Sequence, residues 1–137
     1  MRNELRAFYG AVALVLSIPF VAGLAGAFGG LEGLARVLLV AEPLTVPASL
    51  RNSLRAICFM FFALVPLVIW ALTSLAERAG AFRIIASCGF VAGLARGTGW
   101  VVDGDPGVIP VGIMIIELCG MPALLLWHAR LVRLTQT

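Results

Sequence analysis

The sequence predicts an all-α protein: a four-helix transmembrane bundle with a short interfacial helix between its first and second helices. Three observations lead to this fold class. The 137 residues are 61% hydrophobic and 12% charged, with a mean hydropathy of +1.05, which is too apolar for a soluble domain of this length. Four stretches reach the ~20 apolar residues that a ~30 Å hydrocarbon core requires. Trp70, Trp100 and Trp127 stand near the ends of these stretches, where amphipathic rings prefer to lie.

The whole chain, residues 1–137, is therefore interpreted as a single integral membrane domain. The first and second predicted spans, about 7–31 and 56–76, contain no charged residue. The third, about 84–102, contains only Arg96, and the fourth, about 108–127, contains only Glu117.

The beginning of the chain also fits a second interpretation. Arg2 and Arg6 precede an apolar run that ends in Ala25-Gly26-Ala27, a pattern that a signal peptidase could cleave. The run is about twenty residues long, whereas the apolar core of a signal peptide has about 7–15. We therefore expect an uncleaved first span and keep the cleaved signal as the alternative.

The segment of about 31–50 is predicted to lie on the extracytoplasmic membrane surface. Glu32 and Arg36 are four residues apart on the narrow polar side of a short helix from Leu31 to Ala41, and Pro43 and Pro47 follow it. Small residues also form ridges on the first and third spans: Ala22, Gly26 and Gly30, and Gly89, Gly93 and Gly97. These ridges predict close helix packing, either within the chain or at the face of an oligomer or partner.

The orientation follows from the distribution of arginine. One side carries six arginines against two acids: Arg2, Arg6, Arg78, Arg83, Arg130 and Arg133 against Glu4 and Glu77. The other carries four arginines against five acids: Arg36, Arg51, Arg55 and Arg96 against Glu32, Glu42, Asp103, Asp105 and Glu117. The sums are +4 (6 − 2) and −1 (4 − 5). Arginine excess marks the cytoplasmic side, so both termini are expected there.

The charges within the spans are the candidate site. A charge at the centre of a bilayer costs about 2.5–3.5 kcal/mol on insertion scales, so it is usually paired. Arg96 and Glu117 lie on successive antiparallel spans, and their side chains lean toward each other because helical side chains point toward the helix N-terminus. We therefore expect an ion pair between the third and fourth spans.

A second group of charges opens the second span. Arg51 and Arg55 share a helix face, with Asn52 nearby, and their mutual repulsion predicts an anion beside them. Glu42, Asp103 and Asp105 are the internal candidates; a lipid phosphate or a small carboxylate is the external one. The stretch from Asp103 to Gly107 is predicted to form a type II turn around Pro106.

Other chemistry is not predicted. No nucleophile and base stand together, so no catalytic residue is expected. Cys58, Cys88 and Cys119 lie singly in apolar stretches and His128 is the one histidine, so neither a metal site nor a cofactor is expected, and His128 is interpreted as an interfacial side chain. The chain has no solvated basic run for nucleic acid.

The charged positions also carry a resemblance. Their order resembles that of the bacterial DUF4345 family: Glu42-Pro43, Asn52-Ser-Leu-Arg55-Ala56, Gly93-Leu-Ala-Arg96-Gly97, Asp103-Gly-Asp-Pro106 and Glu117. The resemblance covers about Phe8 to Leu131, with Thr98 and Gly107 where the family more often has serine. It implies a small four-helix bacterial membrane protein related to DoxX-like proteins, and it implies no activity.

The expected function is that of a non-catalytic small protein of the bacterial inner membrane. It would serve as an accessory or assembly component of a larger membrane complex, or as a homo-oligomer, in contact with membrane lipid. The alternative is a ligand-handling membrane protein, either transporter-like or a DoxX-like subunit of a membrane oxidoreductase that contacts quinone or lipid. Fold-level analogy does not decide between these functions.

Overall fold

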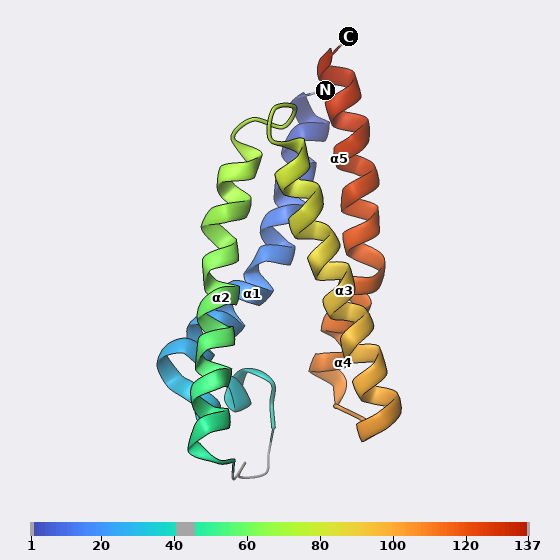
Figure 1. Ribbon diagram of the computed structural model, residues 1–137. Coiled ribbons are helices and arrows are strands. Elements are labelled where there is room, and N and C mark those ends of the chain that lie inside the picture. The colour runs from blue at the N-terminus through green and yellow to red at the C-terminus, as the bar shows by residue number, and fades with distance from the viewer. Residues whose placement is uncertain (1, 41–45, 137) are drawn as a thin grey trace. The chain divides into compact units, whose positions relative to one another are not determined.

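The chain is helical in a computed structural model that describes residues 2–40 and 46–136 (Figure 1). The elements are α1 (Arg2–Val37), α2 (Ala48–Leu72), α3 (Ala79–Asp103), α4 (Val108–Ile115), the π-helix η1 (Ile116–Gly120) and α5 (Met121–Gln136). The last three form one continuous helical rod. Four helices are thus long and apolar enough to cross a membrane, which confirms the predicted all-α class with four long apolar helices.

The first helix is interrupted at Gly30, which has φ 62° and ψ −150°. This backbone conformation is essentially restricted to glycine. Beyond the interruption, Leu31–Val37 forms a separate short helix, somewhat shorter than the predicted 31–41 segment. A Cβ on Gly33 would lie 2.4 Å from the Ala25 carbonyl oxygen, so the short helix packs back onto the end of the long one. Its position at a membrane surface stays a prediction.

The short helix ends at Val37 and is closed by a left-handed residue at Leu39, before the two prolines that follow it in the sequence. Leu39 has φ 55°. The Val40 N–H donates to the Ala35 carbonyl at 2.9 Å, and the Leu39 N–H donates to that of Arg36 at 3.3 Å. These two bonds form a Schellman motif, in which the left-handed position is usually glycine.

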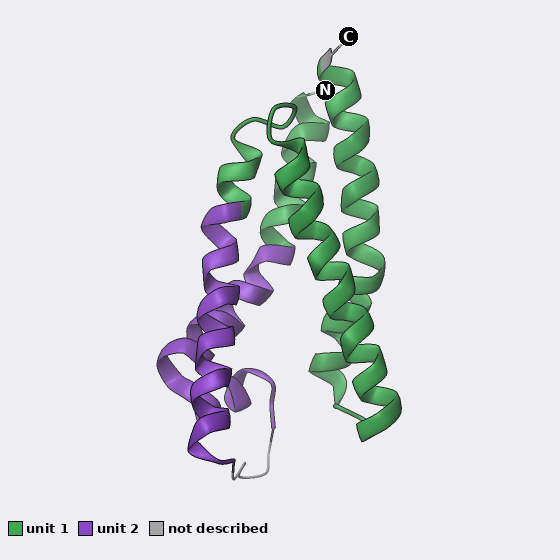
Figure 2. Ribbon diagram, in the orientation of Figure 1, with its two compact units in different colours: residues 1–14, 68–137 green, residues 15–67 purple. Residues whose placement is uncertain are grey.

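The chain forms two compact units, shown in Figure 2: residues 1–14 with 68–137, and residues 15–67. In the first, α3 packs along α4, η1 and α5. The core of this unit includes an aromatic group in which Phe8, near the start of α1, contacts Phe82, Trp127 and His128 with ring centroids 5.6–6.0 Å apart. Nearby, the exposed pair of Glu4 and Arg130 joins α1 to α5 at 3.4 Å.

In the unit of residues 15–67, α1 and α2 meet at glycine. A Cβ on Gly23 would lie 2.7 Å from the Phe62 backbone nitrogen, and one on Gly26 would lie 2.1 Å from the Cys58 sulfur. The predicted ridge therefore includes Gly26 and Gly30, but Gly23 stands in place of Ala22. Because the helix has 3.6 residues per turn, positions 23, 26 and 30 cover a narrower arc of the helix than positions 22, 26 and 30 do.

Candidate functional site

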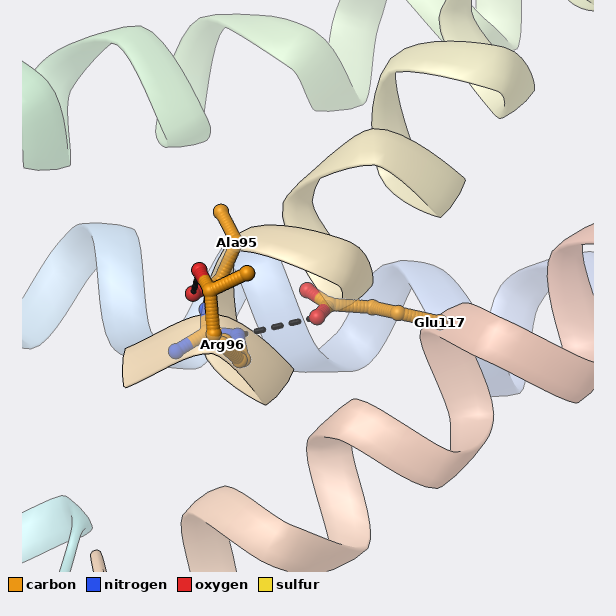
Figure 3. A network of polar contacts seen from close by, with 4 residues as sticks. Ala95, Arg96 and Glu117 are labelled. Atoms are coloured by element: carbon orange, nitrogen blue, oxygen red, sulfur yellow. Dashed lines mark hydrogen bonds and ion pairs between the residues drawn. The ribbon is translucent and has the colours of Figure 1, made fainter. Parts of the chain in front are cut away.

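Arg96 of α3 and Glu117 of η1 form the ion pair that their positions predicted. The Arg96 Nε–H donates to Glu117 Oε2 at 2.9 Å. Figure 3 shows the Glu117 side chain extending from η1 toward Arg96, with the dashed line between them. The Glu117 side chain is 13% exposed and that of Arg96 is 37% exposed. The carboxylate is thus largely enclosed, and the guanidinium lies at the margin of the contact.

The glycine ridge of α3 brings the two helices close enough for this pair. A Cβ on Gly93 would lie 2.8 Å from Glu117 Cβ, and one on Gly89 would lie 2.8 Å from Met121 Cε. At Gly97 the nearest atom is Met114 Sδ at 3.7 Å. The ridge therefore serves packing within the chain, which is the first of the two uses that the sequence left open.

Glu117 lies on a π-helical turn that the sequence analysis did not foresee. The Met121 N–H donates to the Ile116 carbonyl, five residues back. Pro122 follows immediately, and a proline nitrogen cannot donate to the carbonyl four residues before it. The turn before Pro122 is widened into a π-helix. Such turns are rare and frequent at functional sites.

The pair leaves polar atoms unused. Arg96 contacts Glu117 through Nε, so its Nη1 and Nη2 have no acceptor within the described part of residues 68–137. A side-on guanidinium pair would have used two donors on two oxygens. The pair can therefore accommodate a further polar group beside the one contact it makes.

The acids of the last loop form no ion pair with the described residues of the same unit. Asp103 is the last residue of α3, and Asp105 Oδ1 accepts from the Gly107 N–H at 2.9 Å. Gly107 has φ 89° and ψ 171°, whereas the third residue of a type II turn has ψ near 0°. The type II prediction is therefore wrong: the Asp105 side chain closes an Asx turn instead.

The second group of predicted site residues belongs to the other unit. Arg51, Asn52 and Arg55 lie in the first two turns of α2, and all three are exposed. Arg55 packs over Gly30, where a Cβ would lie 3.0 Å from its Nη2. Glu42 lies outside the described residues. Since the two units are described separately, a joint network of these arginines with Arg96, Glu117, Asp103 and Asp105 stays a prediction.

His128 occupies a place that the sequence analysis did not expect. Its side chain is fully buried and stacks on Phe82 with centroids 4.5 Å apart. The interpretation as an interfacial side chain is therefore wrong. Neither imidazole nitrogen makes a hydrogen bond among the described residues. Phe8 and Phe82, which enclose His128, are far from it in the sequence, so no local pattern predicts their contact with the imidazole.

Arg78, in the loop after α2, has hydrogen-bond acceptors for its guanidinium within its own unit. Its Nη1 donates to the Trp70 carbonyl at 2.9 Å and to Thr73 Oγ1. The Arg78 Cζ lies 4.5 Å from the centroid of the Trp70 ring, a cation–π distance. This arginine ties the end of α2 to the loop that follows it.

Four long apolar helices, two of them joined by an ion pair, indicate a small multi-pass membrane protein. The model of one protein family, described as a domain of unknown function (DUF4345), matches residues 7–128. The chain belongs to this family, as the ordered charged motifs predicted. Comparisons with curated proteins and with solved structures gave no match.

Proposed function

We propose that this protein is a non-catalytic component of the bacterial inner membrane, with both termini in the cytoplasm. It serves in the assembly or support of a membrane complex, or it assembles with itself. The observation that carries this proposal is the ion pair at 2.9 Å between Arg96 and Glu117. The only acidic residue of the last span is thus engaged in holding two helices of the chain together.

The surroundings of the pair support a structural role. Gly93 lies against Glu117 Cβ, so the backbone packing and the ion pair fix the same register between α3 and η1. Apolar helices in lipid can slide past each other with little cost, because lipid and leucine offer similar contacts. One charge pair at a defined height removes that freedom.

A double-mutant cycle tests the structural role. Arg96→Gln and Glu117→Gln are each expected to lower thermal stability in detergent, since each leaves one charge without its partner. Removing one partner of a fully buried pair costs about 3–5 kcal/mol; the 37% exposure of Arg96 places the expected cost near the lower end. The double mutant is expected to recover much of the loss.

The matched control is Glu4→Gln, which breaks the pair with Arg130, whose side chain is 70% exposed. Exposed pairs contribute about 0–1 kcal/mol, so little change is expected. If the two single mutants at the α3–η1 pair behave like this control, the structural role is contradicted.

The accessory role is tested by purification from native membrane followed by mass spectrometry. The proposal expects either a constant set of membrane proteins or a defined oligomer of this chain. A single chain that carries no protein partner through gentle solubilisation would contradict it.

The second candidate is a ligand-handling protein, either transporter-like or a DoxX-like subunit that contacts quinone or lipid. The unused Nη1 and Nη2 of Arg96 favour it, because such donors need an acceptor in a non-aqueous environment. Native mass spectrometry would detect a bound quinone or lipid. Arg96→Gln should release this molecule, whereas Arg78→Gln, which alters an arginine already satisfied by Trp70 and Thr73, should retain it.

A further inference from the structure

Two cations near the beginning of α2 have no counter-ion among the described residues of their own unit. Arg51 and Arg55 are four residues apart with exposed side chains. Over the described residues 15–40 and 46–67, neither guanidinium has an ion pair or a hydrogen bond. Like charges at this spacing repel, and the first turn of α2 contains no acidic residue to offset them. An anion from outside the unit would remove this repulsion.

Arg55 lies against the break in α1. Its Nη2 lies 3.0 Å from the position that a Cβ on Gly30 would take, so any larger residue at Gly30 would press on the guanidinium. The glycine conformation at φ 62° that turns the chain there thus also leaves room for this side chain. A side chain larger than hydrogen at position 30 would therefore displace the Arg55 guanidinium.

The length of α2 sets the depth of the pair in a bilayer. After Arg55 the helix continues for 72 − 55 = 17 uncharged residues to Leu72. At 1.5 Å per residue these extend about 25 Å, less than the ~30 Å of a hydrocarbon core. Arg55 therefore starts just inside the core and Arg51 at its edge. Arginine side chains lean toward the helix N-terminus and extend to the interface, which brings both guanidinium groups to the level of lipid phosphates.

We propose that Arg51 and Arg55 bind the phosphate of an anionic membrane lipid. The planar guanidinium presents paired N–H donors that match phosphate oxygens. Two such groups four residues apart on one helix face can approach one phosphate from two directions. A soluble phosphate offers the same chemistry, but the depth of the pair favours a headgroup that is anchored there by its own acyl chains.

The experiment measures thermal stability of the full chain in neutral detergent, with added phosphatidylglycerol, phosphatidylcholine or inorganic phosphate. A molecule that binds the folded state raises the unfolding midpoint. Phosphatidylglycerol is expected to raise the midpoint of the unaltered protein most, phosphatidylcholine less and inorganic phosphate hardly at all. In the double variant R51Q/R55Q the lipid-dependent shift is expected to vanish.

Two further variants keep the test decisive. Arg36→Gln removes another exposed arginine of the same unit and is expected to retain the full lipid shift. R51K/R55K keeps the charge without the planar fork, so it is expected to retain part of the shift even if R51Q/R55Q does not fold. An undiminished shift in R51K/R55K and R51Q/R55Q, or an equal loss in Arg36→Gln, would overturn the site. A shift caused by inorganic phosphate but by neither lipid would overturn the lipid as its occupant.

Discussion

In both units, glycine residues allow two helices to pack closely. The units differ in the charged side chains that lie next to these glycines. In the unit that contains α3, Gly93 lies beneath an arginine and a glutamate that neutralise each other at 2.9 Å. In the unit of residues 15–67, Gly30 lies against Arg55, which has no acidic partner among residues 15–40 and 46–67. Close packing at glycine therefore accompanies an internal ion pair in one unit and an arginine that can bind an external anion in the other.

The contacts also differ in what the glycine meets. Gly23 faces the backbone of α2, with Phe62 N and Cys58 O within 3.0 Å of its Cβ position. Gly97 of α3 faces only the Met114 sulfur at 3.7 Å. Backbone atoms cannot move aside as a methionine side chain can. Gly23 is thus expected to tolerate added atoms less well than Gly97.

The largest effect is expected from adding one methyl group to each contact. Gly23→Ala should lower stability by about 1–3 kcal/mol, the usual cost of overpacking, because neither backbone can shift alone. Gly97→Ala should be neutral or slightly stabilising, since alanine favours helix more than glycine does. Thermal unfolding in detergent measures both. Equal tolerance at both positions would remove the distinction between the two contacts.

A change of comparable size but opposite sign is expected in the aromatic core. His128→Phe replaces a buried ring with two unpartnered nitrogens by an apolar ring of similar shape among Phe8, Phe82 and Trp127. An unsatisfied buried polar group costs about 1–3 kcal/mol, so the unfolding midpoint should rise. His128→Ala, which leaves a cavity, should lower it. A fall in the phenylalanine variant would show that the imidazole has a polar partner.

The smallest effect is expected at the end of the short helix. Leu39 adopts φ 55° with an exposed side chain, and a left-handed conformation costs a non-glycine residue about 1 kcal/mol or more. Leu39→Gly should therefore stabilise the unit of residues 15–67 by up to about 1 kcal/mol. Leu38→Gly, one position earlier in the same turn, is the control and should not stabilise it. Slower amide exchange at Val40 would report the gain.

The sequence predicted those features of the fold that depend only on how deep a residue lies along its span and on the direction in which the span runs. Four apolar stretches gave the long helices, and the heights of Arg96 and Glu117 on antiparallel spans gave their contact. Both inferences use quantities that a helix fixes locally: its rise per residue and the lean of its side chains. Neither requires knowing which distant residues meet.

Other features depend on contacts that no local pattern specifies. His128 looked interfacial because it follows Trp127 at the end of a predicted span, yet Phe8 and Phe82 enclose it. Gly23 replaced Ala22 on the α1 ridge because the direction from which α2 approaches decides which small residue is covered. The π-helix before Pro122 had a signal in the proline, but a kink and a widened turn follow from it equally well.

The widened turn at Ile116–Gly120 has a consequence for the rod that contains it. One surplus residue in a turn changes the helical phase of everything that follows by about 100°, the rotation of a single residue. The rod therefore carries two phases, one before Glu117 and another from Met121 onward. Converting this turn to α geometry at unchanged length would rotate the half that carries His128 by about 100° relative to Val108–Ile115 and away from its aromatic neighbours. Deleting one residue from the turn while restoring α geometry would instead keep the two halves in their present phase.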